Sequence, residues 1–115
     1  MELSNAVSIS FASNHIEAIL NGNKTVTLRI GLEQVPSPGQ PLALCGENDE
    51  PFAAATTSQF WTLSVQEAAA HDWTEHRNYS GTTELCEELG SYYPECELTP
   101  TTTLQAIAWR EPIQV

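Results

Sequence analysis

Positive charge is scarce in this chain of 115 residues, which holds 4 Lys and Arg against 15 Asp and Glu and has a formal net charge of −11. Non-specific adhesion to nucleic acid needs many cations that neutralise phosphates, so this charge balance argues against an extended nucleic-acid surface. It does not exclude a pocket for one base or nucleoside, because there only the local charge matters. Lys24 and Arg29 are two of the four cations and stand in one short stretch, which makes this stretch the first candidate for a functional site.

Cysteine and long apolar runs are also lacking. The three cysteines (Cys45, Cys86 and Cys96) form no CxxC pair, and no histidine stands at ligand spacing beside them, so we expect no metal and no cofactor. Cys45 stands in an apolar strand pattern and is expected in the core. No apolar run approaches membrane-spanning length, and the first residues lack the basic and apolar regions of a signal peptide. We therefore expect a cytoplasmic protein with reduced thiols and no membrane contact.

The length and an apolar content of 41% indicate one small folded domain over residues 1–115. Apolar periodicity predicts helices over 13–21, 65–71 and 84–89, the first ended by Gly22 and the last by Gly90. Alternating or short apolar runs predict strands over 7–11, 24–30, 42–45, 52–61 and 101–110. The segment 52–61 fits helix or strand by propensity, and we predict a strand because it follows 42–45 across a short turn, as in a hairpin.

Helix caps and element order indicate the fold class. Asn14 with Glu17, and Ser64 with Glu67, have the spacing of capping boxes. Several short strands with inserted helices predict an α+β, mainly β fold. The expected form is a small, partly closed barrel of five to six strands with two or three short helices, which leaves few strand edges exposed.

The stretch 22–30 combines the scarce positive charge with a row of hydroxyls. Apolar residues alternate there with Thr27 and Arg29, so the threonine and the arginine share one face of the predicted strand. Lys24 and Thr27 would face opposite sides of a regular strand, and they converge only if Lys24 lies in the turn before the strand begins. The alternative is a solvated turn lysine and an arginine that only forms a structural ion pair. Arg110, at the end of the last strand, is expected on the surface.

A second group of candidates lies in the loop that follows the middle helix. Trp73, His76, Arg77, Asn78 and Tyr79 interleave aromatic, cationic and amide side chains. Such side chains suit a nucleobase, because aromatic rings and guanidinium groups stack on its plane and an amide hydrogen-bonds to its edge. The alternative is a loop whose aromatic residues pack on the core while its charged residues are solvated.

The residues also resemble a known family. The segment 19–29, which reads Ile-Leu-Asn-Gly-Asn-Lys-Thr-Val-Thr-Leu-Arg, resembles the entry motif of ASCH domains, members of the PUA-like β-barrel superfamily. Pro38–Gln40 resembles their turn into the next strand. Tyr92–Pro94, expected to pack the third helix down, and a last strand with an aromatic and a charged end also match in order and spacing. The resemblance covers nearly the whole chain.

This resemblance implies an RNA-related function, because ASCH domains are regarded as RNA-binding modules. A small bacterial branch of the family, similar in size to this chain, hydrolyses N(4)-acetylcytidine with a Lys base, a Thr nucleophile and a Glu proton donor. The lysine falls on Lys24 and the threonine on Thr27, and the arginine two residues on falls on Arg29. The acid position falls on Asn78, whose amide cannot donate a proton as a carboxylic acid does. The nearest carboxylate in the sequence is Glu75.

The first functional hypothesis is therefore a binding module. It recognises RNA or a modified nucleotide in a pocket at the barrel mouth, with Lys24, Thr27 and Arg29 on one side and the aromatic loop on the other. The acidity of the chain restricts contact to a few nucleotides rather than a long RNA.

The second hypothesis is an amidohydrolase that deacetylates N(4)-acetylcytidine, with Thr27 as nucleophile and Lys24 as base. The acid is then either Glu75 or a water held by Asn78. A lysine base must be neutral, which requires its pKa to fall from about 10.4 towards 7. Burial and a neighbouring arginine both act in that direction. A third hypothesis is a ribonuclease in which His76 and Arg77 serve as the acid/base pair.

Overall fold

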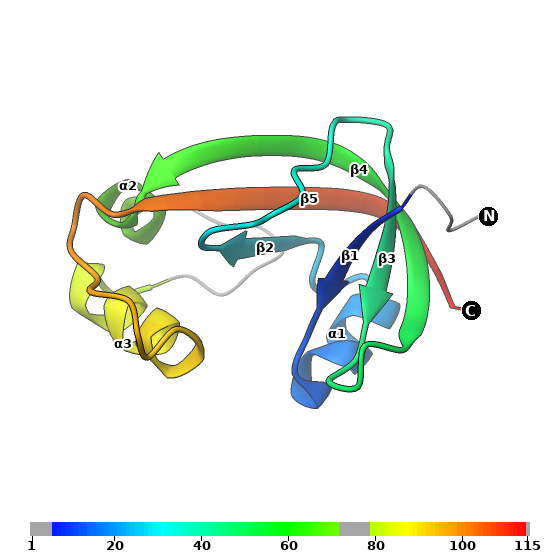
Figure 1. Ribbon diagram of the computed structural model, residues 1–115, viewed down its shortest axis with the longest axis horizontal. Helices are drawn as coiled ribbons and strands as arrows, with labels where there is room; N and C mark the ends of the chain where they lie inside the picture. Colours follow the sequence, from blue (N-terminus) through cyan, green and yellow to red (C-terminus); the bar gives the residue numbers. More distant parts are fainter. Residues whose placement is uncertain (1–5, 72–78, 115) are drawn as a thin grey trace.

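A single curved sheet forms the centre of the protein, whose computed structural model describes residues 6–71 and 79–114. Its five strands lie in the order β1-β3-β4-β5-β2. They comprise β1 (Val7–Ser10), β2 (Val26–Arg29), β3 (Pro41–Cys45), β4 (Pro51–Ser64) and β5 (Thr103–Gln114). The α+β, mainly β prediction is confirmed, and the sheet curls into a half-barrel (Figure 1).

The long strands β4 and β5 form an antiparallel ribbon along the whole sheet (Figure 1). Their register shifts twice, between Ala54 and Thr56 and between Thr57 and Gln59. Bulges of this kind bend a strand and increase its twist, which accounts for the curl. The strand β3 pairs with β4 as the predicted hairpin, and β1 is added to β3 in parallel. At the other edge β2 pairs antiparallel with β5.

Two apolar clusters pack on the sheet, and β5 contributes to both. Leu104 and Ala106 belong to the cluster beneath the last two helices, whereas Ile107 and Trp109 belong to the cluster around β1 and β3. The middle of β5 is therefore covered on both sides. Cys45 is buried in β3, as expected.

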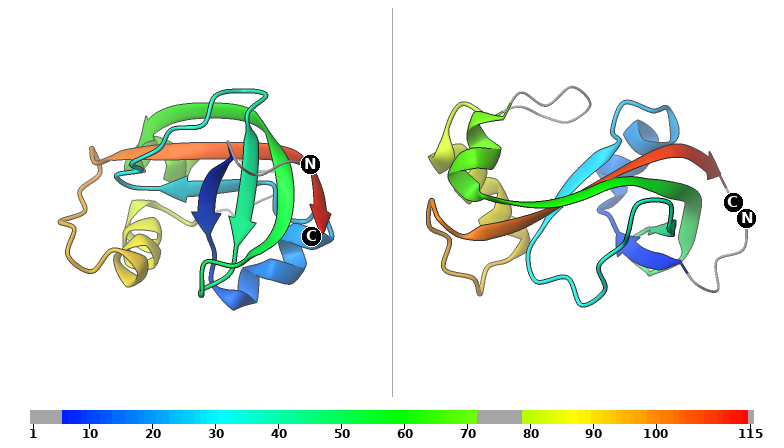
Figure 2. Two further views of the ribbon diagram at one scale, coloured as in Figure 1. Left: turned by 45° about the vertical axis from the view of Figure 1, so that its right-hand side comes forward. Right: turned by 90° about the horizontal axis from the view of Figure 1, so that it is seen from above.

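The helices lie at the two ends of the ribbon, with β2 between them (Figure 2). They comprise a 3-10 turn (η1, Ser13–His15), α1 (Ile16–Leu20), α2 (Val65–Ala70) and α3 (Thr82–Tyr92). None of the helices in the described ranges has the length and apolar character needed to span a membrane.

Helix ends were predicted with mixed success. The capping box of Ser64 and Glu67 is present at the start of α2. The one predicted at Asn14 is wrong, because the chain enters α1 through a 3-10 turn whose N-cap is Ala12, with no side-chain cap. The end at Gly90 is also wrong, since α3 continues to Tyr92 and Tyr93 donates its backbone N–H to Leu89.

The turn between α1 and β2 sets the position of Lys24. Gly22 has a φ of 84°, a left-handed conformation that glycine adopts without steric cost. The backbone N–H of Lys24 then donates to the carbonyl of Ala18 at 3.0 Å, which ties the turn back to α1. The strand starts only at Val26 rather than at residue 24. Lys24 therefore lies ahead of the strand and is not bound by its alternation.

Candidate functional site

Two cavities adjoin between the start of α1, the strand β2 and the end of α3. One has a volume of about 250 Å³ and the other about 460 Å³, on the scale of small-molecule sites. They share four lining residues and so form two halves of one hollow: His15, Thr27, Leu28 and Tyr92. We call the smaller cavity the Arg29 half and the larger one the Lys24 half, after the cation that lines each.

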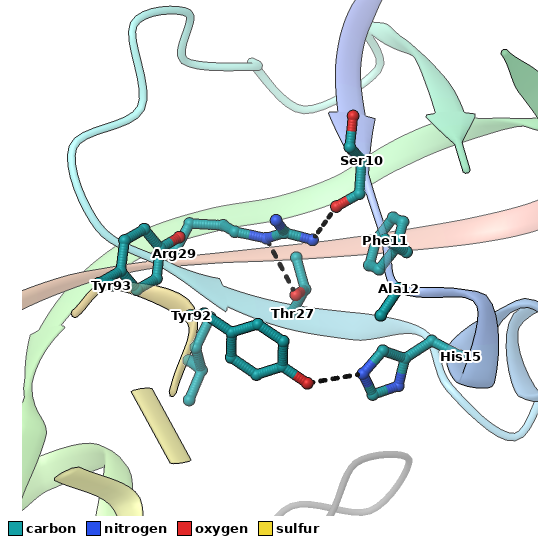
Figure 3. Close-up of a pocket in the computed structure, with 9 residues that line it drawn as sticks. Ser10, Phe11, Ala12, His15, Thr27, Arg29, Tyr92 and Tyr93 are labelled. Atoms are coloured by element: carbon teal, nitrogen blue, oxygen red, sulfur yellow. Dashed lines mark hydrogen bonds between the residues drawn. The ribbon is translucent and has the colours of Figure 1, made fainter. Parts of the chain in front are cut away.

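Neutral groups hold the guanidinium group in the Arg29 half (Figure 3). Arg29 donates from Nε to the Thr27 hydroxyl at 3.3 Å and from Nη2 to the Ser10 carbonyl at 2.7 Å. Its Cζ also lies 4.7 Å from the ring centre of Phe11, a cation–π geometry. Burial lowers the pKa of Arg29, while the neighbouring hydroxyl of Tyr93 acts in the opposite direction. The group remains a cation, because a guanidinium group stays protonated in proteins.

Packing behind the cavity fixes this geometry. Phe11 is buried and meets Trp109 edge to face, with ring centres 5.7 Å apart. Tyr93 accepts a hydrogen bond from the backbone N–H of Ile30 at 3.3 Å. The end of α3 is thereby attached to the end of β2, which leaves Arg29 in a rigid frame.

The Lys24 half contains an amine that is easier to deprotonate than usual. Lys24 is half-buried and donates from Nζ to the carbonyl of Val26 at 3.0 Å. Burial, followed by the positive charge of Arg29, lowers the pKa of Lys24 to about 8, although the Glu88 carboxylate raises it. Thr27, whose hydroxyl accepts from Arg29, lines the same cavity and is 5% exposed. Lys24 and Thr27 therefore line the same hollow, although their spacing would place them on opposite faces of a regular strand.

Helix α3 contributes a carboxylate and a phenol to the hollow. Glu88 lines the Lys24 half and accepts a hydrogen bond from the Tyr79 hydroxyl. The Tyr92 hydroxyl lies 3.3 Å from Nε2 of His15, on the wall that both halves share (Figure 3). Burial and the charge of Lys24 lower the pKa of His15, whereas Glu88 raises it. A neutral imidazole at this position can exchange hydrogen bonds with the phenol in either direction.

Four of the predicted site residues line the hollow: Lys24, Thr27, Arg29 and Tyr79. The five others lie outside the described residues, namely Trp73, Glu75, His76, Arg77 and Asn78. Arg110 is exposed on β5, as expected.

Sequence reasoning missed His15, Glu88 and the role of Tyr92. Tyr92 was expected to pack α3 down, but it is 53% exposed and lines both cavities, while Tyr93 does the packing. Glu88 and Tyr92 are four positions apart on α3, so they share one face of the helix. That spacing was readable in the sequence, whereas nothing local marked His15.

The described part of the chain contains no group of side chains suited to bind a metal ion. No group of three or more His, Cys, Asp or Glu side chains gathers there at metal-binding distances. Cys86 and Cys96 are free thiols beside the open surface of α3, away from the hollow.

Comparison with known proteins gives one kind of match. No protein-family model matches the sequence. No curated protein is significantly similar to it.

Solved structures do match over nearly the whole chain. An ASCH protein from Zymomonas mobilis is similar with a TM-score of 0.70 and 16% identity, over 96% of this chain and 70% of that one. An ASCH domain from Lactobacillus crispatus is similar with a TM-score of 0.66 and 13% identity, over 97% and 82%. A DUF984 protein from Enterococcus faecalis is similar with a TM-score of 0.69 and 16% identity, over 99% and 79%. This chain therefore has the fold of the ASCH-domain structures.

Proposed function

We propose that the protein binds RNA or a modified nucleotide in the hollow between α1, β2 and α3. The observation that carries this proposal is the placement of charge. Two of the four cations of a chain with net charge −11, Lys24 and Arg29, line its two halves. In so acidic a protein, an anion meets favourable potential only where such cations gather.

The chemistry of the walls supports the same ligand class. Arg29 offers charge-assisted donors to a phosphate, and Lys24 offers an ammonium at neutral pH. Tyr79, Tyr92 and Tyr93 supply ring faces and edges against which a base can pack. The volumes suit one or two nucleotides rather than an RNA helix. The contact is therefore local, as the net charge requires.

Isothermal titration calorimetry tests the proposal with the four nucleoside monophosphates and a short single-stranded RNA. We expect saturable binding of at least one ligand, weakened tenfold or more in Arg29→Gln and Lys24→Met. Arg110→Gln is the matched control, because it removes an exposed cation of β5 that lines neither half of the hollow, and it should bind as the wild type does. Absence of saturable heat with every ligand would overturn the proposal.

A second function is favoured by one specific observation, the pKa of about 8 at Lys24. This value leaves about a tenth of the amine neutral at pH 7, on the order of 300 times more than an ordinary lysine. The neutral amine can take the Thr27 proton while the hydroxyl oxygen attacks the acetyl carbonyl of N(4)-acetylcytidine. The amide C–N bond then breaks, cytosine N4 gains a proton, and water releases acetate from the threonine.

The residues around Thr27 fit parts of this reaction. Arg29 donates to the threonine oxygen, so the hydroxyl proton is free to go to a base. Glu88 is a carboxylate that lines the same half as Lys24 and can hold the proton for the leaving amine. Release of cytidine from N(4)-acetylcytidine tests the reaction in the wild type, in Lys24→Met and in Thr27→Val. We expect turnover that both substitutions abolish and Arg110→Gln preserves. A wild type without turnover excludes the amidohydrolase and leaves the binding function standing.

A further inference from the structure

We propose that the hollow binds its ligand in one direction, with a phosphate on Arg29 and a base edge that carries an N–H group on Glu88. The preferred ligand is then a phosphorylated nucleotide whose base has an exocyclic amino group, such as a cytidine nucleotide. This inference rests on the proposed nucleotide binding and adds to it the substrate class and the orientation.

The two halves form one continuous site with different charge. They share the wall made by His15, Thr27, Leu28 and Tyr92, so a single ligand can extend from one half into the other. Among the described residues, no carboxylate lines the Arg29 half. The Lys24 half, by contrast, contains both Lys24 and Glu88. The hollow is therefore cationic at one end and of mixed charge at the other.

The cationic end is built for an anion. The hydrogen bonds from Nε and Nη2 of Arg29 go to a hydroxyl and a backbone carbonyl, and its face lies on Phe11. Each of these partners is neutral, so none of them cancels the positive charge. A guanidinium group has five N–H donors, and those not used by Thr27, Ser10 and Tyr93 remain for phosphate oxygens. The planar guanidinium group already holds these donors in a fixed arrangement, so little conformational entropy is lost when they bind phosphate oxygens.

The mixed end suits a base edge better than a phosphate. Glu88 repels an anion, so a phosphate at this end would lose much of what Lys24 provides. A carboxylate instead accepts from an amino group, as it does from N4 of cytosine. Lys24 can donate to the ring carbonyl beside it. Tyr79 donates its hydroxyl proton to Glu88, which helps to orient the carboxylate. A carboxylate has about four lone-pair sites, so Glu88 can accept from more than one donor, a ligand among them.

Uracil is the informative competitor. It presents a carbonyl oxygen where cytosine presents an amino group, and two acceptors cannot hydrogen-bond to each other. The site should therefore discriminate against uridine nucleotides through Glu88 alone. A glutamine at this position still accepts from Tyr79 through its oxygen and offers an NH₂ donor to the uracil carbonyl. The substitution should reverse the preference rather than only weaken binding.

Calorimetric titration of the wild-type protein with three ligands tests the orientation without any substitution. We expect cytidine 5′-monophosphate to bind at least tenfold more tightly than cytidine, and at least fivefold more tightly than uridine 5′-monophosphate. The first affinity ratio reports how much the contact between the phosphate and Arg29 contributes to binding. The second reports how much the contact between the amino group and Glu88 contributes.

Four variants assign each ratio to its residue. Arg29→Gln should bring cytidine 5′-monophosphate and cytidine to equal affinity, and Glu88→Gln should make the uridine nucleotide the tighter ligand. Arg110→Gln and Glu87→Gln are the matched controls, because each removes an exposed charge whose side chain lines neither half of the hollow, and both ratios should stay at the wild-type values.

The outcomes separate this inference from the function on which it rests. If cytidine binds as tightly as its monophosphate, or if the uridine nucleotide binds the wild type equally well, the orientation is overturned while nucleotide binding stands. If the ratios exist but persist in Arg29→Gln and Glu88→Gln, the assignment to these residues is overturned. If no nucleotide or nucleoside binds, the proposed function fails together with the inference.

Discussion

Lys24 should destabilise the folded protein at neutral pH, and replacing it with methionine should reveal by how much. Its pKa is about 8 in the folded chain against 10.5 in the unfolded chain. Each pKa unit corresponds to about 1.4 kcal/mol, so the difference between the two states corresponds to about 3 kcal/mol. This is an upper value, because partial exposure of the side chain screens part of the effect.

The sign follows from proton binding. Between pH 8 and 10.5 the unfolded chain holds a proton on Lys24 that the folded chain has released. The free energy of unfolding of the wild type therefore rises with pH across this window through Lys24. Below pH 8 both states are protonated, and the cost of burying the charge is fully present. Lys24→Met removes the cost at every pH, at the loss of one hydrogen bond to Val26 worth about 1 kcal/mol.

Urea unfolding of the wild type and of Lys24→Met, followed by tryptophan fluorescence at several pH values, measures the difference. The advantage of the variant should be about 2 kcal/mol at pH 7 and should shrink by about 2–3 kcal/mol by pH 10.5. The subtraction cancels the tyrosines and cysteines that titrate in the same window. Arg110→Met, an exposed cation, should differ from the wild type by an amount that does not change with pH. A pH-independent difference for Lys24→Met would refute the reasoning and place the amine in solvent.

Three further substitutions test the frame of the site by urea unfolding. Phe11→Ala should cost about 3–5 kcal/mol, because the ring is buried against Trp109 and beneath Arg29; a cost under 1 kcal/mol would contradict that packing. Gly22→Ala should cost about 1–2 kcal/mol, since its φ of 84° disfavours a side chain although no atom obstructs it, and an unchanged stability would argue against the left-handed turn. Ser64→Ala should cost about 1 kcal/mol through loss of the capping box, and a neutral result would mean that the cap does not form in solution.

Local patterns in the sequence were sufficient for most of the fold. Alternation predicted β1, and a short apolar run predicted β3. Hairpin spacing identified the ambiguous segment 52–61 as a strand, and the Ser64 capping box located α2. These features depend on residues within about ten positions of each other, which a sequence displays directly. The Gly90 prediction failed because the backbone preference of a glycine is weak beside the packing of Leu89 and Tyr93 on either side of it.

Only the side of the site formed by Lys24 and the strand β2 could be predicted from the sequence. Lys24, Thr27 and Arg29 lie in one stretch and shared an unusual composition, so the sequence alone drew attention to them. The opposite wall comes from α3, and its contact between His15 and Tyr92 joins residues 77 positions apart. No periodicity encodes such a pairing, because it depends on how α1 and α3 are placed by the sheet. Glu88 became a candidate only once the helix was seen against the cavity.

The central claim is that Lys24 and Arg29 make this hollow a nucleotide site, and the lysine provides a direct measurement. Lys24 is the single lysine of the chain, so selective ¹³C labelling of lysine side chains gives one Cε resonance. Titration with cytidine 5′-monophosphate should shift that resonance saturably, and the shift should need far more ligand in Arg29→Gln. A Lys24 resonance that stays in place up to millimolar nucleotide would contradict the account.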